Sequence, residues 1–354
     1  MTFGQTDVMK LLRRLAGLVL VLGLFSLVAG CSGMIKGGSA RANQPLKEAT
    51  LTKLRSMGSG PEKGMLIRIF KQSSELEVWK ETASGYKLFK TYEICAWSGE
   101  LGPKIKEGDR QSPEGFYTIT PGLMNPNSSY YLAFNTGFPN KFDRAHGRTG
   151  SDLMVHGDCS SRGCYSMTDE SIAEIYALAR ETFKGGNPSF QLQIFPFRMT
   201  AQNLAKQAKS THYAFWQNIK EGYDRFELAK APTNWDVCSK QYVFDIPQGV
   251  GVLDAASACP AEVTSRPLSA SLQAKQAADA AAVAAAVASL EKQAAAEKLA
   301  AEKEAAARAE AKARGEAIGG FVTGLFGGGK DADVVKSIDP DKKPPVPLRR
   351  PRPV

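Results

Sequence analysis

The hydrophobic and polar positions in the first half of the chain predict short strands. Residues 65–70 form an almost continuous apolar run, and residues 76–79 form a second strand-like segment after a polar turn. Residues 86–92 continue this hairpin pattern. Further short strands are expected at residues 94–97, 116–119 and 190–195. The pattern therefore predicts a fold that is mainly β.

A few helices interrupt this strand-rich pattern. Between residues 169 and 183, apolar side chains recur at i, i+3, i+4 and i+7, the spacing of one face of a helix. Thr168 or Asp169 is placed to cap its first turn, and Gly185 and Gly186 stop it. A second helix is expected over residues 200–220. The predicted fold class is mainly β with a few helices.

The C-terminal part of the chain changes character. Residues 268–314 are rich in alanine, the best helix former, with Glu, Lys and Arg between the alanines. Glu304 and Arg308 lie at i and i+4 in the order that supports a helix. A continuous helix over this tract would reach on the order of 70 Å. Large apolar residues thin out after Leu299, so a coiled-coil seam is not expected and the tract is interpreted as a semi-rigid spacer.

The N-terminal residues have the pattern of an export signal. Lys10, Arg13 and Arg14 precede an apolar run over residues 15–29. The run ends Leu-Val-Ala-Gly-Cys, which resembles a bacterial lipobox with Cys31 as the lipidated residue. An uncleaved membrane anchor is the alternative, but about fifteen apolar residues are short for a spanning helix. We therefore expect a lipoprotein of the bacterial periplasm, held by its lipid at the outer membrane.

The formal net charge of +9 fits contact with an anionic envelope polymer or a lipid surface. Nucleic acid would also suit a basic chain. The sequence, however, has no Gly-rich phosphate loop of the Walker type, no zinc-finger spacing and no RNP motif. Nucleic acid is therefore not an expected partner.

The candidate chemistry lies in residues 153–167, which read LMVHGDCSSRGCYSM. A short apolar strand ends at His156, and a loop of Ser, Cys and Gly residues leads to Cys164. The two residues are eight positions apart, enough for the loop to turn back and form a base and nucleophile pair. Arg162 adds positive potential that favours the thiolate, the reactive form of cysteine.

Four cysteines remain outside the lipobox and the candidate nucleophile. In an exported protein they can oxidise, and four cysteines allow three connectivities. We favour Cys95–Cys159 and Cys238–Cys259, the first of which would fix the loop before Cys164. A Cys159–Cys164 bond is the alternative that would block the nucleophile.

A metal site is a competing interpretation of the same residues. His146, His156, Cys159 and Cys164 are side chains that zinc accepts. The four lack a recognised zinc spacing, and His146 is more often a hydrogen-bonded loop histidine than a second base. We expect no metal and no cofactor.

Residues 122–150 carry a group of aromatic side chains among Asn, Pro and Gly: Tyr130, Tyr131, Phe134, Phe138 and Phe142. Packing in the core under a long loop is favoured for these rings, because buried aromatic residues are mostly core. The alternative is that some of them form a wall of the substrate site.

These motifs resemble a known enzyme family. His156-Gly157 followed by Ser161-Arg162-Gly163-Cys164 is similar to the signature of the L,D-transpeptidase catalytic domain, the YkuD-type fold. Residues 108–117, GDRQSPEGFY, resemble the strand entry of that family. Residues 104–117, 137–147 and 195–200 look closer still to the YafK branch of murein L,D-transpeptidases, within a resemblance that spans residues 60–245. Ser166 departs from the pattern, because many members have Arg there, and a contact made by that Arg is not expected here.

The resemblance implies a β-sandwich-like domain and a cysteine enzyme acting on peptidoglycan stem peptides. His156 would accept the proton of Cys164, and the sulfur would attack the carbonyl of a diaminopimelate residue to leave a thioester. The backbone N–H at Gly163 would stabilise the oxyanion. The other implied substrate contacts are Gly157, Ser161, Arg162 and His146.

The thioester allows two outcomes. An acceptor amine gives transpeptidation in cell wall remodelling, whereas water gives hydrolysis, and the YafK-type resemblance raises the option of releasing a wall-linked outer-membrane protein. A non-catalytic envelope tether is a third hypothesis, supported by the extensions and opposed by the His156 and Cys164 pair.

The predicted organisation of the chain follows from these segments. A signal peptide, a flexible tether and the catalytic domain occupy residues 1–31, 32–60 and 61–200. A helical extension packed on that domain, the alanine-rich helix and a tail expected to be disordered occupy residues 201–260, 261–317 and 318–354.

Overall fold

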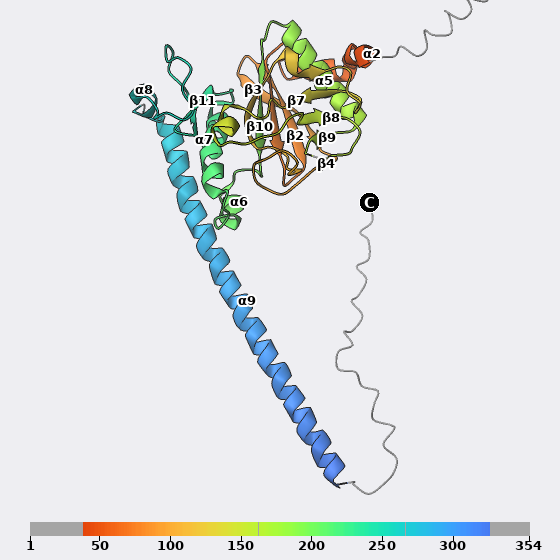
Figure 1. Cartoon of the computed structure of the whole chain (residues 1–354), viewed down its shortest axis with the longest axis vertical. Helices are drawn as coiled ribbons and strands as arrows, with labels where there is room; N and C mark the ends of the chain where they lie inside the picture. The colour runs from red at the N-terminus through yellow and green to blue at the C-terminus, as the bar shows by residue number, and fades with distance from the viewer. Residues whose placement is uncertain (1–37, 162, 266, 326–354) are drawn as a thin grey trace, which may run out of the picture. The chain divides into compact units, whose positions relative to one another are not determined.

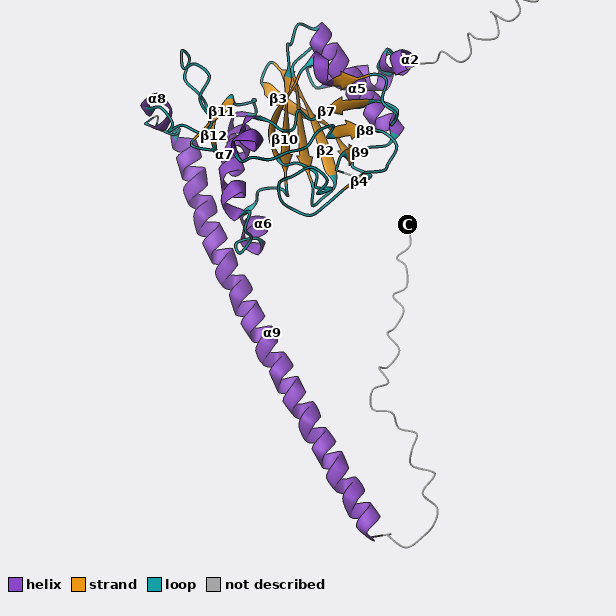
Figure 2. Ribbon diagram, in the orientation of Figure 1, coloured by secondary structure: helices purple, strands orange, loops and turns teal. Residues whose placement is uncertain are grey.

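The centre of the fold is a five-stranded sheet that is covered on both faces. In a computed structural model, which describes residues 38–161, 163–265 and 267–325, its strand order is β3-β2-β1-β10-β5. The strands are β1 (Met65–Phe70), β2 (Glu75–Thr82), β3 (Gly85–Glu93), β5 (Gly115–Ile119) and β10 (Phe190–Phe195). The β1–β10 pair is parallel, and the other three pairs are antiparallel. The predicted hairpin of the first strands is present (Figure 2).

Strand β1 is an almost continuous apolar run because it is buried on both faces. All six of its residues are buried. Successive side chains of a strand point to opposite faces, so Ile67 and Ile69 join one hydrophobic cluster and Phe70 joins another. Strands buried on both faces have few polar residues, and the exception in β1, Arg68, is paired with Glu227 at 2.5 Å.

A second sheet and a helix cover the face that carries Ile67. This sheet has the order β4-β9-β8-β7-β6. Its strands are short: β4 (Ala96–Trp97), β6 (Met124–Asn125), β7 (Ala133–Asn135), β8 (Met154–His156) and β9 (Tyr165–Ser166). The helix α5 (Asp169–Lys184) joins the same cluster, and the Thr168 side chain caps it by accepting from the Ser171 N–H at 3.1 Å. This arrangement confirms a mainly β, sandwich-like fold with a few helices.

The C-terminal extension covers the opposite face. It contains α6 (Ala201–Lys206), α7 (Tyr213–Ala229), β11 (Trp235–Cys238) and β12 (Gln241–Phe244). Side chains of α7 and of this hairpin pack with Phe70, Phe116 and Phe195. In Figure 1, α7 and β11 lie on one side of the large sheet, and β7, β8 and β9 lie on the other.

The extension differs from its prediction in two ways. It is not purely helical, because β11 and β12 form an antiparallel two-stranded sheet. The single helix expected over residues 200–220 is two helices, with a turn between Lys206 and Tyr213. The helical spacing was visible in the sequence, whereas the break was not, because that turn holds no proline or glycine.

The segment expected to be a flexible tether is folded from residue 38 onward, so that prediction is wrong there. It forms α2 (Gly38–Ala42) and α3 (Glu48–Ser56). Leu54 is fully buried in the core, and the Thr50 hydroxyl donates to Glu174 of α5. A few apolar residues in a polar segment give a weak periodic signal, and only the tertiary contacts decide the outcome.

The alanine-rich tract is one helix, α9 (Ala270–Leu325), preceded by the short α8 (Ala261–Thr264). The chain divides into two compact units between Val287 and Ala288. In the first unit, Leu272 of α9 is buried and Val283 packs on the cluster of α7. In the second unit, residues 291–318 are exposed along the helix. Residues 318–325 are helical rather than disordered as predicted, and the rest of the predicted tail lies outside the described residues.

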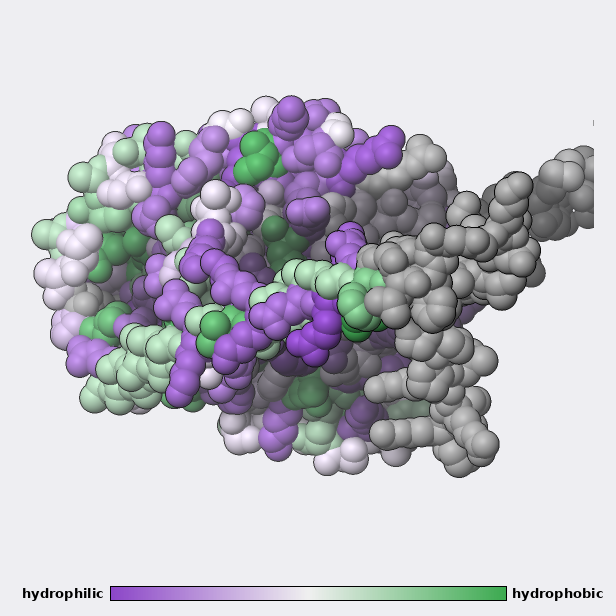
Figure 3. Space-filling view, turned by 90° about the horizontal axis from the view of Figure 1, so that it is seen from below, coloured by the Kyte–Doolittle hydropathy of each residue, from purple (hydrophilic) through white to green (hydrophobic). Residues whose placement is uncertain are grey.

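A helix of the described residues could span a membrane only if it were long and predominantly apolar. Between residues 38 and 325, no helix combines the length and the apolar character needed to cross a bilayer. On the face drawn in Figure 3, the strongly hydrophobic residues form separate spots among hydrophilic ones. The predicted signal segment and Cys31 lie outside the described residues.

The packing of α3 predicts the effect of a single truncation. Leu54→Ala should lower the free energy of unfolding by about 2–5 kcal/mol, because removal of a fully buried leucine leaves a cavity. Urea denaturation followed by tryptophan fluorescence measures it. Ser56→Ala, at an exposed position of the same helix, should change stability by less than about 0.5 kcal/mol. Equal midpoints for the two variants would contradict the packing of α3.

Candidate active site

The two candidate catalytic residues lie at the ends of neighbouring strands. β8 and β9 pair in parallel, with Val155 opposite Tyr165 and His156 opposite Ser166. Cys164 directly precedes β9. Since side chains alternate along a strand, the buried Val155 and Tyr165 point to the core, and His156 and Cys164 share the other face. Cys164 therefore stands two residues before Ser166, the residue that pairs with His156.

The sulfur of Cys164 is held by backbone groups. The Met154 N–H donates to Sγ at 3.3 Å, and Sγ lies 3.6 Å from the Asp152 carbonyl oxygen. Among the described residues, these two groups are its hydrogen-bond partners, and no hydrogen bond joins it to His156. The Cys164 carbonyl accepts from the hydroxyls of Ser161 at 2.6 Å and Ser112 at 3.2 Å. The main chain around the sulfur is thus fixed from two sides.

The imidazole of His156 is arranged to act as a base through Nε2. Its Nδ1 lies 2.5 Å from the carbonyl oxygen of Gly157. A carbonyl oxygen only accepts, so this contact assigns the proton to Nδ1 and leaves the lone pair on Nε2. His156 is buried, with 4% of its surface exposed. The ring is therefore held in one tautomer and largely shielded from water.

Burial disfavours the charged form of both groups. It raises the pKa of the Cys164 thiol, with Asp152 adding to the rise while the Met154 N–H and Lys104 oppose it. Burial also lowers the pKa of His156, against the effects of the Gly157 carbonyl and Asp158. The resting pair is therefore a neutral thiol and a neutral imidazole. The thiolate-favouring role predicted for Arg162 falls on a residue outside the described part of the chain.

Two glycines shape the loop between the pair. The Gly157 N–H donates to the carbonyl oxygens of Tyr130 at 3.0 Å and Leu132 at 3.1 Å. A Cβ at Gly157 would lie 2.5 Å from Oδ1 of Asp169 and 3.0 Å from the Tyr130 carbonyl oxygen, so neighbouring groups would have to shift. Gly163 has a φ of +125°, a conformation that L side chains rarely adopt. Close packing therefore favours glycine at position 157, and the backbone conformation favours it at position 163.

Four of the five cysteines in the described residues form two disulfides, Cys95–Cys159 and Cys238–Cys259. These are the pairs that the sequence analysis favours. The first ties the loop of the site to the segment before β4, and Cys164 is free. Because the sulfur of Cys159 is bonded to Cys95, it is not available to Cys164 or to zinc. No group of three or more His, Cys, Asp or Glu side chains suited to a metal occurs within the described ranges.

Only some of the other residues predicted to bind substrate contact Cys164. The Ser161 hydroxyl lies beside Cys164, as described above. His146 ends α4 (Lys141–Ala145), where its Nδ1 is 3.0 Å from the Phe142 carbonyl oxygen and its ring packs on Phe142 at 4.2 Å. It is exposed, and the groups that it contacts belong to α4 rather than to His156 and Cys164. The structure thus gives His146 a role at a helix end.

Tyr130 belongs to the aromatic group in residues 122–150, for which the sequence favoured core packing and left open a place in the wall of the substrate site. Its ring centroid lies 4.8 Å from that of His156, and 47% of its surface is exposed. By contrast, Phe134, Phe138 and Phe142 are buried in the core. The aromatic segment is therefore divided: the phenylalanines pack, and Tyr130 covers the imidazole.

Lys104 lies at the start of the segment 104–117, and no role of its own was predicted for it from the sequence. It is 3% exposed, and its Nζ donates to Asp109 at 2.5 Å and to the Lys106 carbonyl at 2.9 Å. It contributes positive potential at Cys164. A lysine in a polar loop carries no sequence signal of burial, so only the structure identifies it.

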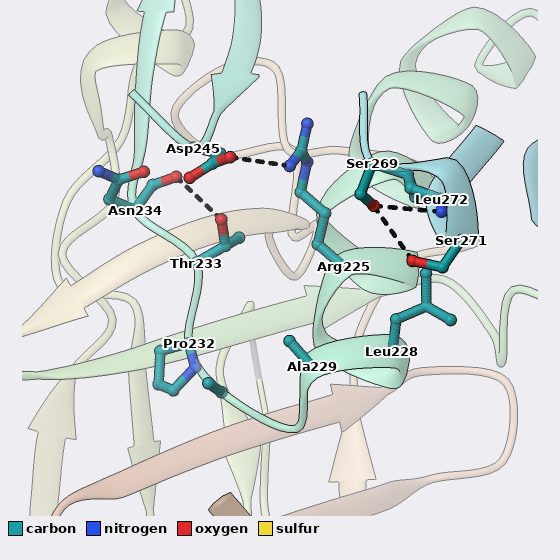
Figure 4. Close-up of a pocket in the computed structure, with 11 residues that line it drawn as sticks. Arg225, Leu228, Ala229, Pro232, Thr233, Asn234, Asp245, Ser269, Ser271 and Leu272 are labelled. Atoms are coloured by element: carbon teal, nitrogen blue, oxygen red, sulfur yellow. Dashed lines mark hydrogen bonds and ion pairs between the residues drawn. The ribbon is translucent and has the colours of Figure 1, made fainter. Parts of the chain in front are cut away.

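A separate pocket of about 560 Å³ lies in the extension (Figure 4). Its walls come from the end of α7, residues 231–234 and the start of α9. Its arginine, Arg225, is paired with Glu221 at 2.9 Å and with Asp245 at 3.6 Å. None of the predicted site residues lines it. It adds no group to the chemistry of His156 and Cys164.

Known proteins are similar in sequence to this domain. The family model YkuD, the L,D-transpeptidase catalytic domain, matches residues 66–188. The chain is 41% identical over 210 residues to YafK of Escherichia coli K12, named as a candidate L,D-transpeptidase, which covers 59% of this chain and 83% of that protein. The protein of the same name from Escherichia coli O157:H7 gives the same values.

Solved structures are more distant. The helical cell shape determining protein Pgp2 of Campylobacter jejuni, as a K307A mutant, is 16% identical, covering 54% of this chain and 82% of that one, with a TM-score of 0.31. Bd1075 of Bdellovibrio bacteriovorus is 21% identical, covering 47% and 60%, with a TM-score of 0.28. At these TM-scores they add nothing to the assignment, which the sequence relatives carry. The chain belongs to the L,D-transpeptidase family, with a YkuD catalytic domain.

Proposed function

We propose that this protein is a cysteine acyl-transfer enzyme that acts on peptidoglycan stem peptides. Membership of the L,D-transpeptidase family supports the substrate class. The observation that carries the chemistry is the shared face of His156 and Cys164, with the imidazole held as the tautomer that has a free Nε2. The other cysteines of the described residues are in disulfides, so Cys164 is the nucleophile.

The proposed reaction begins from the neutral pair. His156 Nε2 takes the proton of Cys164 as Sγ forms a bond to the carbonyl carbon of a diaminopimelate residue. Backbone N–H groups at Gly163 and Cys164 stabilise the oxyanion. The C–N bond then breaks, the leaving amine takes the proton from His156, and a thioester remains. Since burial disfavours the separated ion pair, proton transfer accompanies the attack rather than preceding it.

The fate of the thioester separates two activities of one site. An amine of a second stem peptide gives a crosslink, whereas water cleaves the thioester and frees Cys164. Where the amine that left belonged to a protein attached to the wall through diaminopimelate, the overall reaction is a hydrolysis that releases this protein. The similarity to YafK-type proteins favours including the hydrolytic outcome in the test. We also propose that the protein works in the periplasm from a lipid anchor at Cys31, and mass spectrometry of the mature N-terminus tests that anchor.

Replacing the nucleophile is the direct test. Cys164→Ala should reduce activity on purified sacculi by about 10³-fold or more, because no other group can form the thioester. Chromatography of the released muropeptides distinguishes transfer, seen as new 3-3 crosslinks, from hydrolysis, seen as loss of attached peptide.

The matched control for this test is a cysteine change elsewhere. The double variant Cys238→Ala/Cys259→Ala removes the disulfide of the extension and keeps Cys164, so it should retain activity where it is folded. Activity in Cys164→Ala would contradict the assignment. If wild-type Cys164 is not acylated by a carbapenem-type compound and sacculi are unchanged, a non-catalytic tether becomes the better account.

The two pKa shifts predict the pH dependence. Because the pKa of the Cys164 thiol is raised, its alkylation by iodoacetamide should increase through a midpoint above the ordinary value of 9.0. Because the pKa of His156 is lowered, the acid limb of kcat/KM should have its midpoint below 6.5. Both profiles are measured on the same preparation, with Cys164→Ala as the blank. An alkylation midpoint at or below neutral pH would mean a resting thiolate and imidazolium instead.

A further inference from the structure

Residues 112–114 form hydrogen bonds with Cys164 and with Tyr165, the residue that follows it. The Ser112 hydroxyl donates to the Cys164 carbonyl at 3.2 Å, and the Pro113 carbonyl accepts from the Tyr165 hydroxyl at 2.7 Å. The Ser112 hydroxyl also accepts from the Ser98 N–H at 3.2 Å. One short segment thus contacts both Cys164 and the residue after it. A shift of this segment would move the sulfur relative to the imidazole.

A buried ion pair holds this segment. Lys71 and Glu114 are both fully buried and lie 3.0 Å apart. The Lys71 ammonium also donates to the carbonyl oxygens of Ser112 at 3.1 Å, Gly102 at 2.9 Å and Glu100 at 2.7 Å. Burying two charges costs several kcal/mol of desolvation for each ion, so such a pair is weak evidence for stability. The four acceptors of the Lys71 ammonium instead fix the geometry of the loop that carries Ser112.

The C-terminal extension completes this ion pair. Trp216 of α7 is 1% exposed, and its Nε1–H donates to Glu114 Oε2 at 2.8 Å. The other carboxylate oxygen, Oε1, accepts from Lys71 and from the Gly102 N–H at 2.7 Å. Trp216 lies outside residues 66–188, which match the catalytic domain. A side chain from beyond the family domain therefore orients the carboxylate that anchors the segment behind Cys164.

We propose that Trp216, Glu114 and Lys71 form a positioning network that fixes the main chain of Cys164 through Ser112. The reaction rate of the catalytic domain then depends on the hydrogen bond that Trp216 of the extension donates to Glu114. This inference rests on the proposed role of Cys164 as the nucleophile. A displacement of about 1 Å in a reacting group can cost on the order of 10²-fold in rate, so a contact that never touches substrate can affect turnover.

Trp216→Phe tests the network, because it removes the N–H donor and keeps a ring to pack on Phe197. We expect its kcat on stem peptides to fall by about 10-fold or more, with KM within about twofold of wild type. The matched control is Trp235→Phe, in the same extension and packed on Phe116 and Tyr242. That variant should keep both constants within about twofold. Equal kcat values for the two variants would overturn the proposal.

A double-mutant cycle separates positioning from simple loss of stability. Ser112→Ala removes the hydroxyl that contacts Cys164 and should also lower kcat. If Trp216 acts through Ser112, the double variant should lose less than the product of the two single losses. If the loss of kcat in the double variant equals the product of the two single losses, the two effects are independent, and this result would count against the network. Melting temperatures, measured first, limit the comparison to folded protein.

Two further measurements keep the test decisive. If Trp216→Phe does not fold, benzothienylalanine incorporated in place of Trp216 removes the N–H without changing the ring shape, and the same losses are expected. The cycle is also run with iodoacetamide alkylation of Cys164, which needs no peptide. Coupling in alkylation without any wild-type peptide activity would support the network and reject the proposed substrate, whereas absence of coupling in both assays would reject the network.

Discussion

Burial of both faces of the sheet β3-β2-β1-β10-β5 is the constraint on which the structure depends. One face carries the second sheet and α5, and the other carries α7 and the hairpin β11–β12. The strands that present the candidate residues, β8 and β9, have three and two residues. Strands of this length are not stable by themselves. They keep their positions because Val155 and Tyr165 are anchored in the core shared with the large sheet.

The sequence could predict the parts of this molecule that depend on local pattern. The strands β1, β2 and β10 have six to eight residues, with a nearly continuous apolar run in β1 and apolar residues among polar ones in β2 and β10, and α5 has both a cap and a clear apolar face. His156 and Cys164 stand out because their motif is compact. The strands β6 and β9 could not be predicted as such, because two residues carry no period. The packing of α3 depends on contacts such as Thr50 with Glu174, 124 positions away.

The contacts that hold the site in place could not be predicted from local sequence pattern for the same reason. Lys71 and Glu114 are 43 positions apart, and Glu114 and Trp216 are 102 apart. A lysine after a strand and a glutamate in a loop are usually solvated, so sequence alone assigns them to the surface. Their burial changes how the extension is understood. It covers a hydrophobic face, and it also supplies the Trp216 N–H at the end of a chain of contacts to Cys164.

The bond between Cys95 and Cys159 places an electrophilic sulfur five positions before a free thiol. Thiol–disulfide exchange between such neighbours proceeds through the thiolate. The burial that raises the pKa of Cys164 keeps the sulfur protonated, and therefore slow to attack the bond beside it. Burial of Cys164 thus disfavours thiol–disulfide exchange with the disulfide of its own loop. A protein of this design can retain a reactive cysteine and a structural cystine together in an oxidising compartment.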